Sequence, residues 1–333
     1  MKKFLLLILS TIFALTIIPS CKKDNDPASL SLYCPDGAPA LSVARLISDD
    51  TIVDNLDINV VTASTINAYV TGDTPKADIA IMPVNAASKV LGNANSYQML
   101  GVVTWGNLYL LKKQSGVNIT VNNLNDLIGK KVGVINLANV PGLTFKAILS
   151  DNDVPFTTYS GTVDTESVNL VGLSDGTAVT PAADCDYFVV PEPAATTKIN
   201  ATAGKLSLAG DLQAMYGDGN GYPQAVLVAK KSVILDRKSD IDKLIASFND
   251  NYAYLIDDAT SSNDIVSAIT SALPEGTAPT FTANNLNKTV ISNCGISFKT
   301  ASIAKTEVLA YLSKINAITN NSFGTPIDAF FFS

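Results

Sequence analysis

From residue 30 onward, short apolar runs alternate with segments of helical periodicity, and this alternation limits the fold more than any other feature of the chain. Residues 78–82 and 186–190 are examples of runs that are almost entirely apolar, and a helical pattern follows each of them. Strands buried on both faces have this composition. The alternation therefore predicts an α/β protein in which mostly parallel sheets are covered by helices on both faces.

The alternation occurs twice. After a first series that includes a helix predicted over residues 38–47, the pattern starts again at Asn122, and a mostly helical tail covers residues 239–315. Between the two series, residues 97–105 and 108–112 are interpreted either as a pair of strands or as one long, bent strand. Two successive series followed by a helical tail predict two α/β lobes, with the tail returning to pack on the first lobe.

Charge and hydropathy exclude some classes of partner. The net charge is −7, the only arginines are Arg45 and Arg237, and basic residues form no run longer than a short pair. Nucleic-acid phosphates need a basic face, so no nucleic-acid partner is expected. Beyond the amino-terminal leader, no run of 18 or more apolar residues exists that could span a membrane.

The chain contains no histidine. This absence removes the commonest general base, the Ser-His and Cys-His nucleophile pairs and most catalytic zinc sites. We therefore expect no enzymatic activity, no cofactor and no metal. Of the four cysteines, Cys34, Cys185 and Cys294 are widely separated and lie in or beside apolar segments, which favours buried thiols. A Cys34–Cys294 disulfide stays open as an alternative outside the cytosol.

The first 21 residues resemble the leader of a bacterial lipoprotein. Two lysines are followed by an uncharged run over residues 4–18, which is too short to span a bilayer as a helix. Ile-Pro-Ser-Cys closes this run and is similar to a lipobox, which implies a signal peptide over residues 1–20 and lipidation of Cys21. Residues 21–28 are then expected to form a flexible tether. An ordinary secretory signal with an incidental cysteine is the alternative.

Four strand-to-helix turns are rich in proline, glycine, asparagine and acidic residues, namely residues 34–39, 82–85, 136–142 and 190–193. In an open α/β sheet, ligands bind at the carboxyl ends of the strands, where such turns meet. The helix after each turn directs unpaired backbone N–H groups at the same place. Any single turn is also explained by ordinary loop chemistry. All four together, two in each series, predict a ligand cleft between two lobes.

Several segments resemble the solute-binding proteins of ABC importers with the type II periplasmic-binding fold, nearest the branch that binds sulfonate, nitrate and thiamine pyrimidines. Residues 124–134, LNDLIGKKVGV, are similar to that family's DLKGKKVGV segment. Three further segments resemble family motifs in the same order along the chain, namely ADIAIM at 77–82, DYFVVPEP at 186–193 and FGTPIDAFF at 323–331. The resemblance covers nearly all of residues 30–331.

The resemblance implies a two-lobed protein with a discontinuous first lobe, residues 29–107 and 222–333, and a second lobe, residues 108–221. It also implies an extracytoplasmic, lipid-anchored, monomeric protein that captures a small molecule and delivers it to an ABC permease. The motifs contain no arginine or histidine, so a neutral or heterocyclic ligand is favoured over an anion. The residues expected to bind it are Asp36, Gly37, Ala38, Asn85, Trp105, Asn139, Gly142, Glu192 and Tyr222.

Other interpretations stay open at this point. A ligand sensor that docks to a receptor would use the same cleft, and a small-molecule synthase shares the fold, although the synthases related to thiamine-pyrimidine synthesis depend on histidines that this chain lacks. Trp105 is equally explained as a packing residue, because aromatic residues at strand ends usually pack. Asp36 and Glu192 are equally explained as helix-capping acids.

Overall fold

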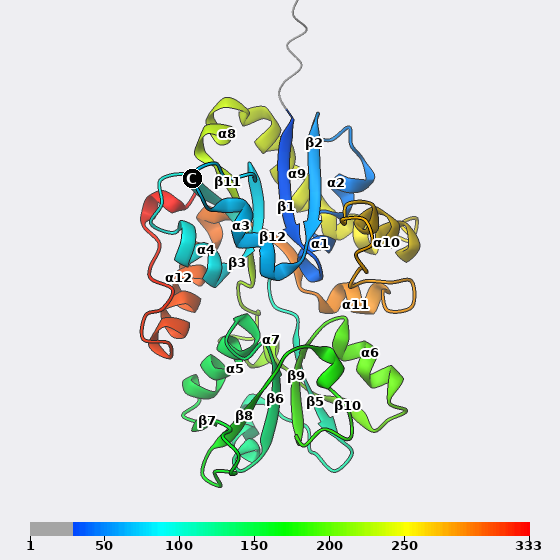
Figure 1. The fold of residues 1–333 in the computed structure, drawn as a ribbon, viewed down its shortest axis with the longest axis vertical. Helices are drawn as coiled ribbons and strands as arrows, with labels where there is room; N and C mark the ends of the chain where they lie inside the picture. Colours follow the sequence, from blue (N-terminus) through cyan, green and yellow to red (C-terminus); the bar gives the residue numbers. More distant parts are fainter. Residues whose placement is uncertain (1–28) are drawn as a thin grey trace, which may run out of the picture.

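Two six-stranded sheets form the framework of the computed structural model, which describes residues 29–333 (Figure 1). In spatial order, the first sheet contains β12 (Ile296–Thr300), β4 (Tyr97–Thr104), β11 (Ala225–Lys230), β3 (Ile79–Pro83), β1 (Leu30–Pro35) and β2 (Leu56–Val61). The second sheet contains β10 (Leu206–Asp211), β5 (Leu108–Lys113), β9 (Tyr187–Pro191), β6 (Lys131–Ile135), β8 (Val168–Leu173) and β7 (Phe156–Thr158).

Helices cover both faces of each sheet, which confirms the predicted α/β class (Figure 1). Those packed around the first sheet are α1 (Ala38–Leu41), α2 (Ala44–Ser48), α3 (Ile66–Val70), α4 (Val84–Leu91), α8 (Lys231–Asp236), α9 (Lys238–Ile256), α10 (Ser262–Ser271), α11 (Lys288–Asn293) and α12 (Ala301–Ala317). Those around the second sheet are α5 (Val140–Asp151), α6 (Ala194–Ala201) and α7 (Leu212–Met215). We call each sheet with its helices a lobe.

Strand direction follows from how the chain travels between the lobes. In the first sheet, β1, β2, β3 and β4 run one way, whereas β11 and β12 pair antiparallel with their neighbours. In the second sheet, only β5 runs against the other strands. Because β5 and β11 each follow a passage between the sheets, they enter their sheet from the interlobe end and must run opposite to the parallel strands.

The helix expected over residues 38–47 is instead two short helices, α1 and α2. The side chain of Asn251 on α9 lies at the break, where its Nδ2 donates to the Leu41 carbonyl at 3.0 Å and its Oδ1 accepts from the Arg45 amide at 3.2 Å. This buried amide replaces backbone hydrogen bonds that a continuous helix would make, and so satisfies the backbone at the break. A contact between residues so far apart in the chain leaves no local sequence signal.

Residues 97–105 and 108–112 form two strands, as the first of the two alternatives expected, and not one bent strand. β4 belongs to the first sheet and β5 to the second, and residues 105–107 connect them. Gly106 adopts φ +89°, a conformation that favours glycine, and this residue turns the chain between the two sheets.

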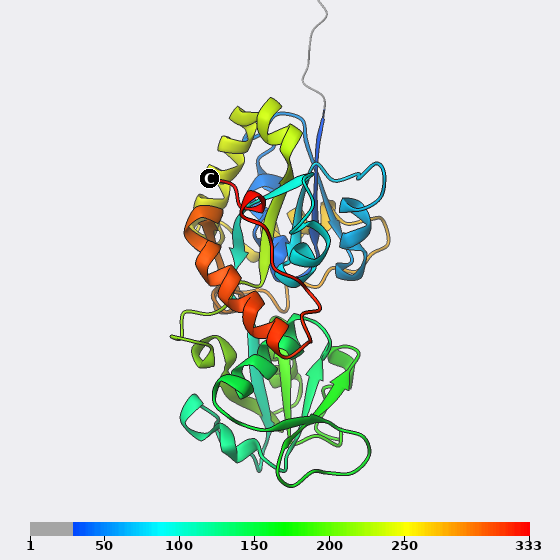
Figure 2. The same ribbon diagram turned by 90° about the vertical axis from the view of Figure 1, so that its left-hand side faces the viewer.

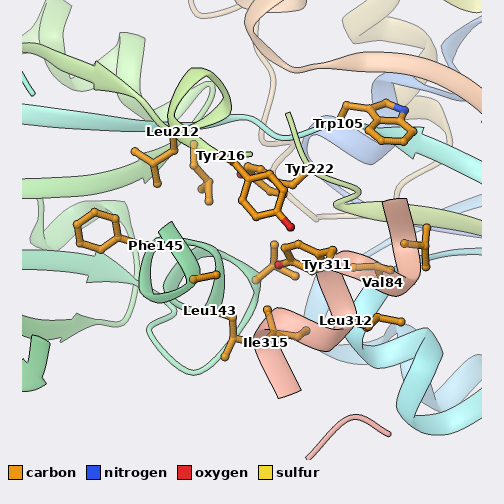
Figure 3. Packing of buried hydrophobic residues seen from close by; sticks show 14 of the residues in the cluster. Val84, Trp105, Leu143, Phe145, Leu212, Tyr216, Tyr222, Tyr311, Leu312 and Ile315 are labelled. Carbon is orange, nitrogen blue, oxygen red and sulfur yellow. The ribbon is translucent and has the colours of Figure 1, made fainter. Parts of the chain in front are cut away.

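The apolar core is continuous between the lobes on one side of the molecule. α12 runs down the first lobe and reaches α5 of the second lobe (Figure 2). Between them, Tyr216, Tyr222 and Tyr311 pack together, with the parallel rings of Tyr222 and Tyr311 5.8 Å apart (Figure 3). Phe145 and Leu143 from α5 belong to the same buried cluster.

No helix within residues 29–333 combines the length and the apolar character needed to cross a membrane. The predicted signal peptide over residues 1–20, the lipidated Cys21 and the tether over residues 21–28 lie outside the described residues.

Candidate ligand site between the lobes

Pairing directions place the predicted turns at facing edges of the two sheets. The chain leaves the first sheet at the carboxyl end of β4, and β1 and β3 run in the same direction as β4. The chain leaves the second sheet at the carboxyl end of β10, and β6 and β9 run in the same direction as β10. The turns after β1, β3, β6 and β9 therefore all lie at the interlobe edges of their sheets, as α1, α5 and α6 show in Figure 1.

The two passages between the lobes, residues 105–107 and 212–224, pack directly against each other. Gly221 has φ +82°, and a Cβ atom on it would lie 2.3 Å from the Trp105 carbonyl oxygen. A Cβ atom on Gly106 would lie 2.8 Å from the ring of Tyr222. Glycine is therefore required at both positions for the two chains to approach so closely.

The turn after β1 contains three predicted ligand residues. The carboxylate of Asp36 accepts hydrogen bonds from the Gly37 amide at 2.8 Å and from both the amide and hydroxyl of Thr280, at 2.8 and 2.7 Å. Gly37 adopts φ +99°, and Ala38 is buried as the first residue of α1. These hydrogen bonds connect the loop before α11 to the end of β1, so Asp36 has a structural role whether or not it also contacts a ligand.

The predicted asparagines differ in their surroundings. Asn85, near the start of α4, is buried, and its Oδ1 has no hydrogen-bond partner. Asn139 precedes α5, is exposed and makes no capping hydrogen bond with its side chain. Gly142 is needed for local packing, because a Cβ atom there would lie 2.0 Å from the Leu137 carbonyl oxygen. Asn85 and Asn139 thus leave polar groups available at the interlobe edges of both sheets.

Glu192 has a capping role and also connects the two lobes. Its carboxylate accepts hydrogen bonds from the amide and hydroxyl of Thr196 in the first turn of α6, at 3.1 and 2.7 Å. The Nδ2 of Asn293, on α11 of the first lobe, donates to the same carboxylate at 3.2 Å. The structure therefore brings this residue into direct contact with the opposite lobe.

Tyr222 lies in the core between the lobes. Its side chain is fully buried, stacks on Tyr311 and donates its hydroxyl to Gln213 Oε1 at 3.3 Å. These contacts give Tyr222 a packing role, and a ligand contact for it stays a prediction.

Solved structures with this arrangement are known. A crystal structure of an ABC transporter protein from Parabacteroides distasonis superposes with a TM-score of 0.71 at 18% identity, covering 92% of this chain and 99% of that one. The periplasmic aliphatic sulphonate-binding protein SsuA from Escherichia coli gives a TM-score of 0.63 at 12% identity, covering 92% of each chain. The alkanesulfonate-binding SsuA from Xanthomonas axonopodis pv. citri, solved with bound MOPS, gives 0.55 at 13% identity, covering 90% and 95%. No protein-family model and no curated protein matches the sequence.

The chain has the two-lobed fold of ABC-transporter substrate-binding proteins. The type II periplasmic-binding architecture expected from the sequence is thereby confirmed at the level of the fold. At these identities the similarity concerns the fold alone, so ligand and partner remain to be argued from the residues of this chain.

A cavity of about 760 Å³ lies beside the two passages, a volume in the range of small-molecule sites. Its walls come from both lobes and include Tyr109, Asp211, Gln213, Asn249, Tyr252, Asn293 and Phe298. These residues belong to β5, the end of β10, α7, α9, α11 and β12. Of the nine predicted ligand residues only Trp105 lines this cavity, with the Lys299 ammonium 3.8 Å from its ring centre.

The arrangement of the charged side chains limits which anionic ligands and metal ions the described residues can bind. Both arginines are engaged within the first lobe, Arg45 with Asp250 at 3.5 Å and Arg237 with Asp240 at 2.6 Å. Within residues 29–333, no group of three or more cysteine or acidic side chains is placed to hold a metal ion.

The three described cysteines, Cys34, Cys185 and Cys294, are buried free thiols, as the sequence favoured, and burial raises the pKa of each. The alternative of a Cys34–Cys294 disulfide is therefore wrong for this structure.

Three polar residues beside the passages have no motif and were not anticipated. Thr104 is the last residue of β4, Asn107 ends the first passage and Gln224 ends the second. Only their position marks them in the sequence, since Thr104 is the last residue of a buried strand and Asn107 and Gln224 each directly precede one.

Proposed function

We propose that this protein is an extracytoplasmic solute-binding lipoprotein that captures a small molecule between its lobes and delivers it to an ABC importer. The observation that carries the proposal is the facing arrangement of the strand ends of two sheets beside two closely packed passages. Ligands of open α/β sheets bind at such strand ends. The similarity of fold to sulfonate-binding proteins and other ABC-transporter proteins supports the same role.

In this proposal, residues 29–107 and 222–333 move as the first lobe and residues 108–221 as the second. The ligand contacts the turns at residues 36–38 and Asn85 from one side, and Asn139, Gly142 and Glu192 from the other. Closure of the lobes excludes water and strengthens each polar contact. The protein acts as a monomer without a cofactor and has no catalytic step.

In this proposal, attachment of the protein to the membrane depends on the amino-terminal leader. Cys21 carries the lipid and holds the mature protein at the bacterial membrane. Cys21→Ser should release the protein from the membrane fraction and abolish labelling by a fatty-acid analogue. Unchanged fractionation of the variant would contradict the lipoprotein assignment and leave the binding function to be judged separately.

Binding is tested with the ligand that co-purifies with the protein, released by denaturation and identified by mass spectrometry. The identified compound should then change the fluorescence of Trp105, the only tryptophan, which lies in the first passage between the lobes. Asn139→Ala or Asp36→Ala should weaken binding about tenfold, roughly 1.4 kcal/mol. If both folded variants bind the ligand as tightly as the parent, these turns have only a structural role and the assignment of the ligand site to them is wrong.

A further inference from the structure

Three residues at the interlobe edge of the first sheet each carry a buried polar atom without a hydrogen-bond partner. The atoms are Thr104 Oγ1, Gln224 Oε1 and Asn85 Oδ1, and the Trp105 indole N–H, a donor in the adjoining first passage, is also buried without a partner. The Gln224 amide donates to the Thr104 carbonyl at 3.0 Å, and the Gln224 carbonyl accepts from the amide of Val84, the residue before Asn85, at 3.0 Å. Backbone hydrogen bonds thus place the three residues side by side on β4, the second passage and α4.

A chain of hydrogen bonds from the second lobe determines which atom Gln224 presents. The Glu192 backbone carbonyl can only accept, so the group of Asn107 that lies 3.3 Å from it is the Nδ2 donor. The Oδ1 of Asn107 then accepts from Gln224 Nε2 at 2.8 Å. This assignment leaves Gln224 Oε1 as the unsatisfied group, and it is an acceptor.

Unsatisfied buried acceptors are uncommon in folded proteins, because each loses its hydrogen bonds to water without replacement. Two such acceptors, Gln224 Oε1 and Asn85 Oδ1, lie at the edge that faces the second lobe together with the Thr104 hydroxyl, which can donate or accept, and the fold by itself does not require them. A ligand that donates hydrogen bonds would satisfy them when it binds.

We propose that Thr104, Gln224 and Asn85 form the hydrogen-bonding floor of the ligand site, and that the ligand is an uncharged molecule with at least two N–H or O–H donors. This inference rests on the proposed binding function and specifies the class of solute. Asn107 acts as a positioning residue, since it orients Gln224 through the contact with Glu192.

The groups around this floor favour an uncharged ligand over an anion, and the Lys299 ammonium over the Trp105 ring is already paired with Glu307 at 3.0 Å. A sulfonate offers only acceptor oxygens, which cannot satisfy the acceptor of Gln224. The nearest charge in the hydrogen-bonded chain is the buried carboxylate of Glu192, which would repel an anion. Arginine is the side chain best suited to bind a sulfonate through two parallel hydrogen bonds. Both arginines are paired with aspartates elsewhere in the first lobe.

The test uses the full-length protein and a thermal-shift panel of small probes in two sets. The uncharged donors are cytosine, uracil, adenine and benzamide, and the anions are nitrate, ethanesulfonate and benzenesulfonate. We expect stabilisation by at least one uncharged donor and by none of the anions. For the best probe, Thr104→Val and Gln224→Met, which removes the acceptor oxygen, should each weaken affinity tenfold or more by calorimetry.

Ser247→Ala is the matched control, because the Ser247 hydroxyl is also buried without a partner but belongs to α9 and not to β4, the second passage or α4. It should leave affinity unchanged. Without a probe, Thr104→Val should be as stable as the parent or more stable, since it replaces an unsatisfied hydroxyl by a methyl group of the same shape. A lower affinity with undiminished stability separates a ligand contact from a structural role.

Stabilisation by anions alone, no stabilisation by any uncharged donor, or unchanged affinity in both folded variants would overturn the inference. If Thr104→Val does not fold, Gln224→Met alone decides the outcome. Binding of a sulfonate with a change in Trp105 fluorescence would refute this ligand class while preserving the proposed binding function. Failure of every probe, together with no small molecule in the purified protein, would refute both.

Discussion

The hydroxyl groups of Thr144 and Tyr311 lie 2.8 Å apart and join α5 of the second lobe to α12 of the first lobe. The contact is buried and sits beside the stacked rings of Tyr222 and Tyr311. Lys314 and Asp151 form an ion pair between the same two helices. The lobes are therefore attached on this side by polar and apolar contacts as well as by the chain, so any closing motion must pivot about this attachment or break it.

Removing the Tyr311 hydroxyl should weaken this attachment. We expect Tyr311→Phe to lower the free energy of unfolding by about 1–3 kcal/mol, because the Thr144 hydroxyl is left buried without a partner. Urea denaturation measures the loss. Adding Thr144→Val to Tyr311→Phe should recover part of it, since both polar groups are then absent.

Tyr254→Phe is the control for loss of a tyrosine hydroxyl. Tyr254 donates to the Ser48 hydroxyl at 2.8 Å, but this contact is exposed, and water can replace it. We expect a change within roughly 0.5 kcal/mol. Equal losses for Tyr254→Phe and Tyr311→Phe would show that the interlobe contact contributes nothing specific.

Gly221→Ala should disrupt the packing of the two passages. Its Cβ atom would lie 2.3 Å from the Trp105 carbonyl oxygen, and its φ of +82° is unfavourable for alanine. We expect a loss of at least about 2 kcal/mol in the free energy of unfolding, measured in urea. Gly217→Ala is the matched control, because Gly217 also has a positive φ, +57°, but has open space around it, so only about 1 kcal/mol should be lost. Similar losses for both would contradict the close approach.

The buried thiols should be inert in the folded protein. Burial raises the pKa of Cys34, Cys185 and Cys294, and the thiolate is the reactive form. In the Cys21→Ser protein we expect negligible reaction with a thiol-specific disulfide reagent under native conditions. About three thiols per chain should react after unfolding in guanidinium chloride. Recovery of only one thiol would indicate a disulfide and contradict the structure.

Stability should fall at alkaline pH because of buried tyrosines. Burial raises the pKa of Tyr109, Tyr216, Tyr222 and Tyr311, whereas tyrosines in the unfolded chain ionise near their ordinary pKa of about 10. The folded state therefore keeps protons that the unfolded state releases above that pH. The stability tied to these groups is complete below pH ~10 and is lost progressively as the pH rises further.

Absorbance of tyrosinate measures this effect directly. Tyr109, Tyr216, Tyr222 and Tyr311 should ionise only in a cooperative step that coincides with loss of circular dichroism. Ionisation of all eleven tyrosines in a single step before unfolding would contradict the burial of the interlobe cluster.

Much of the architecture could be predicted from the local pattern of apolar and polar residues. The apolar run of β3 and the helical pattern of α4 directly after it imply the same α/β layering wherever the segment lies in the chain, because the periods of strands and helices are local properties. The turns at Asp36 and Glu192 were placed at strand ends for the same reason. Their contacts with Thr280 and Asn293 were not foreseen, since those partners lie far along the chain.

By itself, the sequence determined the α/β class, the two series of elements and the absence of histidine chemistry, because these depend on composition and short-range periodicity. Only the tertiary structure decided that Asn251 divides the first helix, that Tyr311 of α12 meets Thr144 of α5, and that Asn107 orients Gln224. Each of these is a side-chain contact between segments brought together by folding. Such contacts depend on angles and distances summed over the whole chain, and no short window of sequence contains them.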